Sequence, residues 1–155
     1  MYFSTIERRT MKNDKLTIYL AGKMYGLSKE EMTEWRNLIR DQLYKYADIA
    51  GKMIKVISPC DYYNFDNPRH QNEKEVMEYD LSLVRKSDIV IVNTFQLNTS
   101  VGSIMEVYEA HKLGIPVIAY GVSYDYLHPW LKECINREEI CVVDLCEYIK
   151  DFYMW

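Results

Sequence analysis

The feature that most constrains this chain is the alternation of short apolar runs, rich in β-branched residues, with longer segments of helical periodicity. Four runs occupy residues 15–21, 53–57, 88–93 and 115–120, and a fifth is expected at 140–143. Each run is short and is followed by a glycine, proline or asparagine, or by a polar segment, as strands usually are. A chain that alternates strands with helices forms a mostly parallel sheet with right-handed crossovers.

The segments between these runs carry apolar side chains at helical spacing. The clearest start is Ser28, because Ser28 and Glu31 have the spacing of a capping box. Asn72 is expected to cap the next helix. Helices on both faces of a five-stranded sheet make a flavodoxin/Rossmann-like three-layer α/β sandwich, which is the fold we predict. Helices are expected over residues 28–46, 72–86, 102–113 and 144–152.

The length of 155 residues suits a single domain, which we place at residues 15–155. Residues 1–14 are polar and aperiodic and are expected to form a flexible arm. They carry charges where a signal peptide needs an apolar segment, and no later stretch is apolar enough to cross a bilayer. We therefore expect a cytoplasmic protein without membrane contact.

The formal net charge of −4 disfavours a nucleic acid polymer as partner, because such a surface repels the phosphate backbone. The four cysteines show no CxxC pair and no histidine at metal-ligand spacing, so we expect neither a metal nor another cofactor. Cys141 and Cys146 are expected to pack in the core. His70, His111 and His128 are scattered, and surface or capping positions are expected for them.

In parallel sheets, ligands bind at the carboxyl ends of the strands, near a switch point of the topology. This rule selects the loops at residues 22–27, 93–102 and 121–128. In the first of them, backbone N–H groups around Gly22, Lys23 and Met24 are able to face an anion. A tight turn without a ligand would look the same, and the loop matches neither GxGxxG nor the P-loop pattern.

The loop before the third expected helix carries small hydroxyl residues where a ligand can approach the backbone. Ser100, Gly102 and Ser103 lie at the helix start, and Glu106 follows about one turn later. A carboxylate in that position can lie against a ligand, or it can simply complement the helix dipole.

Two further carboxylates, Asp80 and Asp88, frame the strand that precedes this loop. Asp80 has apolar neighbours and is expected to face inward, whereas Asp88 can equally be a turn residue. Glycosyl transfer uses a pair of carboxyl groups with opposite roles, one attacking the anomeric carbon and one exchanging a proton with the leaving group.

Taken together, four motifs resemble the nucleoside 2-deoxyribosyltransferase family over roughly residues 15–120. They are Tyr19-x-x-Gly22, Asp80-Leu-x-x-Val-x-x-Ser-Asp88, Ser100-x-Gly-x-x-x-Glu106 and Ala110-x-x-x-Gly114-x-Pro-Val117. The family includes transferases that exchange the bases of 2′-deoxynucleosides and hydrolases that cleave 2′-deoxynucleoside 5′-monophosphates. No single motif would suffice, but their order and spacing are specific as a set.

The resemblance implies a role for each matching residue. Glu106 corresponds to the nucleophile that forms a covalent deoxyribosyl intermediate, Tyr19 to the tyrosine that positions it, and Asp80 to the proton donor. Substrate contacts are implied for Gly22, Lys23, Met24, Asp88, Ser100, Gly102 and Ser103. Lys23 stands where the monophosphate-cleaving branch often has serine, and Ser100 matches a serine that contacts the 5′-phosphate in that branch.

The resemblance favours transfer of the sugar to a free nucleobase, with hydrolysis of a 5′-monophosphate as the alternative. A non-catalytic nucleotide sensor and a hydrolase of ribonucleotides or ADP-ribose compounds remain open. Family members are typically homo-oligomers that complete their sites across an interface. Here, the aromatic C-terminal residues 152–155 are expected either to reach a neighbouring subunit or to pack on their own domain.

Overall fold

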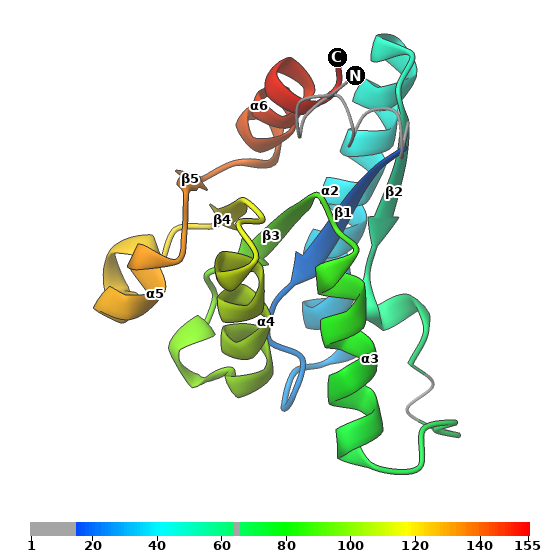
Figure 1. Ribbon diagram of the computed structural model, residues 1–155, viewed down its shortest axis with the longest axis vertical. Helices are drawn as coiled ribbons and strands as arrows, with labels where there is room; N and C mark the ends of the chain where they lie inside the picture. The colour runs from blue at the N-terminus through cyan, green and yellow to red at the C-terminus, as the bar shows by residue number, and fades with distance from the viewer. Residues whose placement is uncertain (1–14, 64–65) are drawn as a thin grey trace, which may run out of the picture.

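The structure, a computed structural model, describes residues 15–63 and 66–155. The predicted arm at residues 1–14 lies outside the described residues. Figure 1 shows a central sheet with helices on both sides. The described strands are all parallel, in the order β2-β1-β3-β4-β5, which is the flavodoxin-like order and confirms the predicted fold class. They are β1 (Lys15–Ala21), β2 (Met53–Ile57), β3 (Ile89–Asn93), β4 (Val117–Tyr120) and β5 (Arg137–Glu139).

Two apolar clusters, one on each face of the sheet, hold the three layers together. Helices α2 (Lys29–Ala50) and α6 (Val142–Tyr153) bury their apolar sides on one face. Helices α3 (Glu73–Arg85), α4 (Val101–Lys112) and the short α5 (Pro129–Glu133) cover the other. The face covered by α3 and α4 carries the inward-facing residues of the candidate site.

Strand β1 lies between β2 and β3 and alternates its side chains between the two clusters. Ile18 and Leu20 face α2 and α6, whereas Tyr19 and Ala21 face α3 and α4. Tyr19 pairs in register with Ile57 of β2 and with Val90 of β3. This register places a fully buried tyrosine beneath α4, close to the carboxyl end of the sheet.

The helix starts predicted from capping residues are confirmed. The Ser28 hydroxyl accepts a hydrogen bond from the Glu31 amide at 3.1 Å, and the Glu31 carboxylate accepts one from the Ser28 amide at 3.0 Å. Asn72 Oδ1 accepts from the Glu75 amide at 2.9 Å. The α3 start is important because it places Asp80 two turns into the helix, with its side chain half-buried.

The fifth strand was predicted at the wrong residues. It is Arg137–Glu139, a short polar segment at the edge of the sheet, and the apolar run that follows it belongs to the start of α6. Val142, Leu145, Cys146 and Ile149 have helical spacing and pack on the sheet together. Cys141, expected in the core, is exposed, and its sulfur caps α6 by accepting from the Asp144 amide at 3.5 Å.

Short 3₁₀ helices in the connections after β2, β3 and β4 were not predicted: η1 (Pro59–Asp61), η2 (Leu97–Thr99) and η3 (Tyr124–Tyr126). Helix α5 was not predicted either. Among the described residues, no helix combines the length and the apolar character needed to cross a bilayer.

Candidate active site

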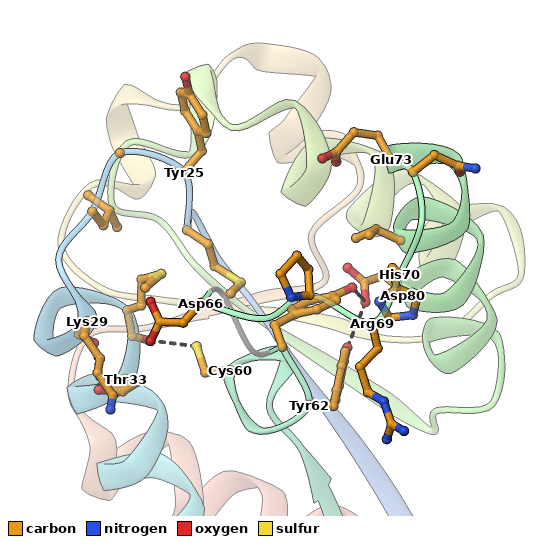
Figure 2. A pocket seen from close by; sticks show the side chains of 18 of the residues that line it. Tyr25, Lys29, Thr33, Cys60, Tyr62, Asp66, Arg69, His70, Glu73 and Asp80 are labelled. Carbon is orange, nitrogen blue, oxygen red and sulfur yellow. Dashed lines mark hydrogen bonds between the residues drawn. The ribbon is translucent and has the colours of Figure 1, made fainter.

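A cavity of about 1160 Å³ lies at the carboxyl ends of β1 and β2 (Figure 2). Its walls come from the β1–α2 loop, the first turn of α2, the segment between β2 and α3, and the inner side of α3. Aromatic and methionine side chains provide apolar surface, and charged side chains of both signs stand among them. The lining side chains include Met24, Tyr25, Lys29, Met32, Cys60, Tyr62, Tyr63, Asp66, Arg69, His70 and Asp80.

Glu106 lies on the inner face of α4, between the helix and β1. Its side chain is only 8% exposed, and it accepts a hydrogen bond from the hydroxyl of fully buried Tyr19. Val107 and Ala110 on the same helix pack into the apolar cluster and fix the orientation of this helix face. The structure therefore brings together the predicted nucleophile and the tyrosine predicted to position it.

Burial raises the pKa of Glu106 to about 8, and the nearby charge of Asp80 acts in the same direction. The hydrogen bond from Tyr19 and the positive charge of Arg36 oppose this rise. Burial and the Glu106 carboxylate also raise the pKa of Tyr19, so Tyr19 remains a neutral donor. A carboxylate in such a place is less well solvated than one in water, and burial favours its protonated form.

Asp80 faces the cavity from α3 and is anchored by two tyrosines. Tyr62 and Tyr63 both donate to Oδ1 of Asp80, at 2.8 and 2.6 Å, and Figure 2 shows Tyr62 pointing toward Asp80. Burial raises the pKa of the Asp80 carboxyl group, and the two tyrosine hydroxyls and His70 partly offset the rise. The two hydrogen bonds fix the orientation of the carboxyl group. Its pKa stays above the ordinary range because burial outweighs the effect of these bonds.

A chain of hydroxyl contacts connects the cavity wall with the buried carboxylate. Tyr62 donates to Asp80 and interacts electrostatically with Tyr19, whose hydroxyl donates to Glu106. Asp80 and Tyr62 belong to the described residues that line the cavity, whereas Tyr19 and Glu106 do not. The two carboxyl groups thus lie on either side of a tyrosine pair, with Asp80 nearer to the cavity.

The first loop has a different structural basis from the one expected. A Cβ atom on Gly22 would lie 2.6 Å from the ring of Trp35, so tight packing against α2 requires glycine here. Lys23 reaches across to the loop after β3, donating to Gln96 Oε1 at 2.7 Å and to Thr99 at 3.5 Å. Met24 lines the cavity.

The residues predicted at the start of α4 lie next to one another. Ser100 donates to the hydroxyl of Ser103 at 2.8 Å, and a Cβ on Gly102 would meet no atom within 4 Å. Among the described cavity-lining residues, none comes from the loops at 93–102 and 121–128, although the strand-end rule selected both. The open surface around Gly102 leaves room for a ligand at this helix start.

Asp88 lies away from the other candidates. Its Oδ2 accepts from the Thr17 amide at 2.8 Å, and its own amide donates to the Thr17 carbonyl at 2.7 Å. These contacts tie the start of β3 to β1, at the amino ends of the strands. The structure thus gives Asp88 the turn-like role that the sequence left open, and it does not bring Asp88 to the cavity.

Four residues of the site were missed. Tyr62, Tyr63 and His70 follow β2, and the strand-end rule would have found them had it been applied to that loop. His70 stands beside Tyr63, with ring centroids 5.7 Å apart. Arg36 gave no signal, because its place in α2 resembles that of any surface arginine. His128, by contrast, caps α5 by accepting from the Trp130 amide at 3.2 Å, as expected for a capping histidine.

Across residues 15–63 and 66–155, no group of three or more histidine, cysteine, aspartate or glutamate side chains is arranged to hold a metal ion.

The aromatic C-terminal residues differ in their exposure. Met154 is buried and Tyr153 packs partly against the core, whereas Phe152 and Trp155 are 62% and 70% exposed. Figure 1 places this end of α6 near the start of β1, away from the connections after β1 and β2 whose residues line the cavity.

No family model matches the sequence, and comparison with curated proteins gives no match either. Solved structures do match. A conserved protein from Enterococcus faecalis V583 has a TM-score of 0.72 at 17% identity, covering 88% of this chain and 98% of its own.

Two matched enzymes have named activities. A 2-deoxyribosyltransferase from Bacillus psychrosaccharolyticus matches with a TM-score of 0.62 at 17% identity, covering 85% of this chain and 91% of its own. A CMP N-glycosidase from Clostridium botulinum matches with a TM-score of 0.52 at 14% identity, covering 88% and 99%. At these identities the comparison concerns the fold: this chain has the fold of a nucleoside 2-deoxyribosyltransferase, as the sequence motifs had indicated.

Proposed function

We propose that this protein cleaves the N-glycosidic bond of 2′-deoxynucleosides or their 5′-monophosphates and transfers the sugar to another nucleobase, with Glu106 as nucleophile. The observation that carries the proposal is the buried pair in which Tyr19 donates to Glu106, one tyrosine contact away from Asp80 at the cavity. The shared fold with two enzymes named for nucleoside and nucleotide chemistry supports it.

The first half of the proposed reaction forms a bond between Glu106 and the sugar. An oxygen of the carboxylate attacks C1′, the C1′–N bond breaks, and its electron pair leaves with the base. In the proposed step the Asp80 carboxyl group, whose pKa burial raises, gives its proton to the departing base. Tyr19 orients the attacking carboxylate through its hydrogen bond. The transition state resembles an oxocarbenium ion, which a 2′-deoxy sugar forms more readily.

The second half regenerates the carboxylate. A nitrogen of an incoming base attacks C1′, the bond to Glu106 breaks, and the proton of that nitrogen returns to Asp80. If water attacks instead, its proton goes to Asp80, and the product is the free sugar or its 5′-phosphate. Two steps of modest barrier replace one difficult displacement. Aromatic and methionine side chains on the cavity wall, including Tyr25, Tyr62 and Met24, provide apolar surface for a flat base.

Hydrolysis of a 5′-monophosphate is the second candidate, and one contact favours it. Lys23 places its ammonium group against Gln96 and Thr99, directly before the α4 start at Ser100 and Ser103. An ammonium group, two hydroxyls and a helix start suit a phosphate. In this alternative the cavity holds base and sugar, and the phosphate lies toward Lys23.

A substrate panel separates these possibilities. Purified protein is incubated with deoxyinosine, dIMP, dCMP and CMP, with and without free adenine, and the products are resolved by chromatography. Base exchange that requires added adenine supports transfer, whereas base loss restricted to monophosphates supports hydrolysis. Cleavage of CMP would extend the substrate range to ribonucleotides. Binding of these compounds with no turnover of any of them would contradict the proposal and indicate a nucleotide sensor.

A further inference from the structure

Arg36 carries a buried charge to which the proposed reaction assigns no direct step. Its side chain is fully buried in helix α2, beneath the turn that follows β1. Removing a guanidinium group from water is costly unless its donors find acceptors and its charge finds a counter-charge. The position of Arg36 therefore raises the question of what compensates it.

The donors of Arg36 are satisfied by backbone carbonyls and a thiol. Nη2 donates to the Gly22 carbonyl at 3.0 Å, Nη1 to the Met32 carbonyl at 2.6 Å, and Nε to the Leu20 carbonyl at 3.4 Å. Nη1 also lies 3.6 Å from the sulfur of Cys60. Within the described part of the chain, none of these hydrogen-bond partners is a carboxylate.

These contacts tie α2 to the backbone that carries Tyr19. Leu20 follows Tyr19 in β1, and Gly22 begins the turn. Arg36 therefore binds the backbone on the side of Tyr19 that leads toward the cavity. The guanidinium also lies 4.5 Å from the ring centroid of Trp35, the ring that excludes a side chain at Gly22. Arg36 thus fixes the strand end from which the Tyr19 hydroxyl reaches α4.

Four polar or charged groups interact electrostatically with Glu106. They are Tyr19 on β1, Asp80 on α3, Tyr63 in the segment after η1, and Arg36 on α2. Of these, Asp80 is the second acidic group and Arg36 is the positively charged one. Cys60 and Tyr62 are the further titratable neighbours of the guanidinium. Two carboxyl groups near each other disfavour double ionisation, and a buried cation relieves that repulsion.

We propose that Arg36 is a positioning residue for the nucleophile: it fixes the turn after β1 and supplies a buried positive charge that favours the ionised form of Glu106 beside Asp80. The direction of its influence agrees with this role, because the Arg36 charge lowers the pKa of Glu106 against the effect of burial. Only the catalytic consequence rests on the proposed function; the effect on Glu106 itself is a property of the folded protein.

The direct test follows the ionisation of Glu106 without any substrate. The protein is labelled with ¹³C at glutamate side-chain carboxyls, the Glu106 signal is assigned by its loss in Glu106→Gln, and its chemical shift is followed against pH. In Arg36→Met the titration midpoint should rise by roughly one pH unit or more, as expected for loss of a nearby opposite charge. An unchanged midpoint in folded Arg36→Met overturns the proposal.

Two further variants separate charge from packing. Arg36→Lys retains the charge and should keep a midpoint close to that of the wild type. Arg40→Met removes an arginine one turn later, where Arg40 binds Asp61 near the surface, and should leave the midpoint unchanged. If Arg36→Met does not fold, Arg36→Gln replaces it as the neutral variant. A midpoint in Arg36→Lys that rises as far as in a neutral variant would also overturn the proposal.

The same variants are then compared by the pH dependence of kcat/KM for base release. The rise of kcat/KM with pH should move upward in the neutral variant together with the Glu106 midpoint, and a purely structural role would lower kcat/KM without moving it. If the protein releases no base but the Glu106 midpoint shifts, the role of Arg36 is supported and the proposed function is contradicted. If the protein releases base but neither the midpoint nor the pH profile shifts, the proposed function is supported and the role of Arg36 is contradicted.

Discussion

At the residue scale, the central observation is a carboxylate that the fold keeps from water. Glu106 is 8% exposed and has a hydroxyl donor in Tyr19, yet burial still raises its pKa to about 8. The more exposed Glu109, three residues later, has its pKa lowered by contacts with Arg85 and Lys112. One helix therefore carries two glutamates with opposite environments, which provides a matched pair for mutation.

Glu106→Gln should lower base release by at least about a thousandfold, because an amide cannot serve as the nucleophile. Glu109→Gln is the control: it removes a surface ion-pair partner and should cost at most about 1 kcal/mol of stability with little change in turnover. Steady-state rates with the substrate found in the panel give the comparison. Comparable losses in both variants would show that turnover depends on the integrity of the helix and not on this carboxylate.

The raised pKa of Glu106 also predicts a pH-dependent cost to stability. The folded protein binds the Glu106 proton up to about pH 8, whereas the unfolded chain releases it near pH 4.5. Between these values the unfolded chain gains the free energy of ionisation and the folded protein does not, so the stability of the folded state falls as the pH rises, and Glu106→Gln lacks this effect. The free energy of unfolding of Glu106→Gln relative to the wild type should increase from pH 5 to pH 8, as measured by urea denaturation. A difference that stays constant over this range would contradict the raised pKa.

At the scale of elements, capping residues were the most informative part of the sequence. Ser28 with Glu31, and Asn72, predicted the starts of α2 and α3, because their side chains satisfy amides that any helix start leaves unpaired. The β5–α6 region failed for the opposite reason. A four-residue apolar run fits both a buried strand and the first turn of a helix, and only packing on the sheet decides between them.

The candidate site was predictable where one motif sits on one element and less so where several elements meet. Tyr19, Asp80 and Glu106 were identified from the family resemblance of the motifs that carry them; in the structure Tyr19 donates to Glu106, and Asp80 accepts from Tyr62. The contributions of Tyr62 and Arg36 depend on how the segment after β2 and helix α2 pack against β1. Contacts of that kind carry no local signature in the sequence.

Gly22 and Gly102 were both predicted to admit a ligand, and the structure distinguishes them. Gly22→Ala would push a methyl group into the Trp35 ring and should destabilise the protein by about 1–3 kcal/mol. Gly102→Ala meets no atom and lies in a helix, so it should be neutral or stabilise the protein by up to about 1 kcal/mol.

Thermal denaturation of both variants, with base release measured in parallel, tests this distinction. Unchanged stability with lost activity in Gly102→Ala would support ligand approach at the α4 start. An unaffected melting temperature in Gly22→Ala would contradict the packing role of Gly22.

At the scale of the whole molecule, Figure 1 shows the C-terminus near the start of β1, whereas the residues that line the cavity follow the carboxyl ends of β1 and β2. The exposed side chains of Phe152 and Trp155 therefore cannot serve the site of their own chain, and any contact with a site requires a neighbouring subunit. We propose a homodimer or higher homo-oligomer on this basis, since exposed aromatic side chains favour association.

Sedimentation velocity tests the proposed assembly. The wild-type protein should sediment as a dimer or larger species, and the double variant Phe152→Ser, Trp155→Ser should shift toward the monomer. The buried neighbour Met154 is left in place so that α6 stays packed. A wild-type protein that is monomeric at micromolar concentration would exclude a shared site.

The central claim is that Glu106 forms a covalent bond with the sugar. Rapid acid quenching of protein during turnover, followed by peptide mass spectrometry, measures this directly. The account predicts a mass increase equal to one deoxyribosyl group, or its 5′-phosphate, on the peptide that contains Glu106, and none in Glu106→Gln. Base release by Glu106→Gln at the wild-type rate, with no adduct on Glu106 in the wild type, would contradict it.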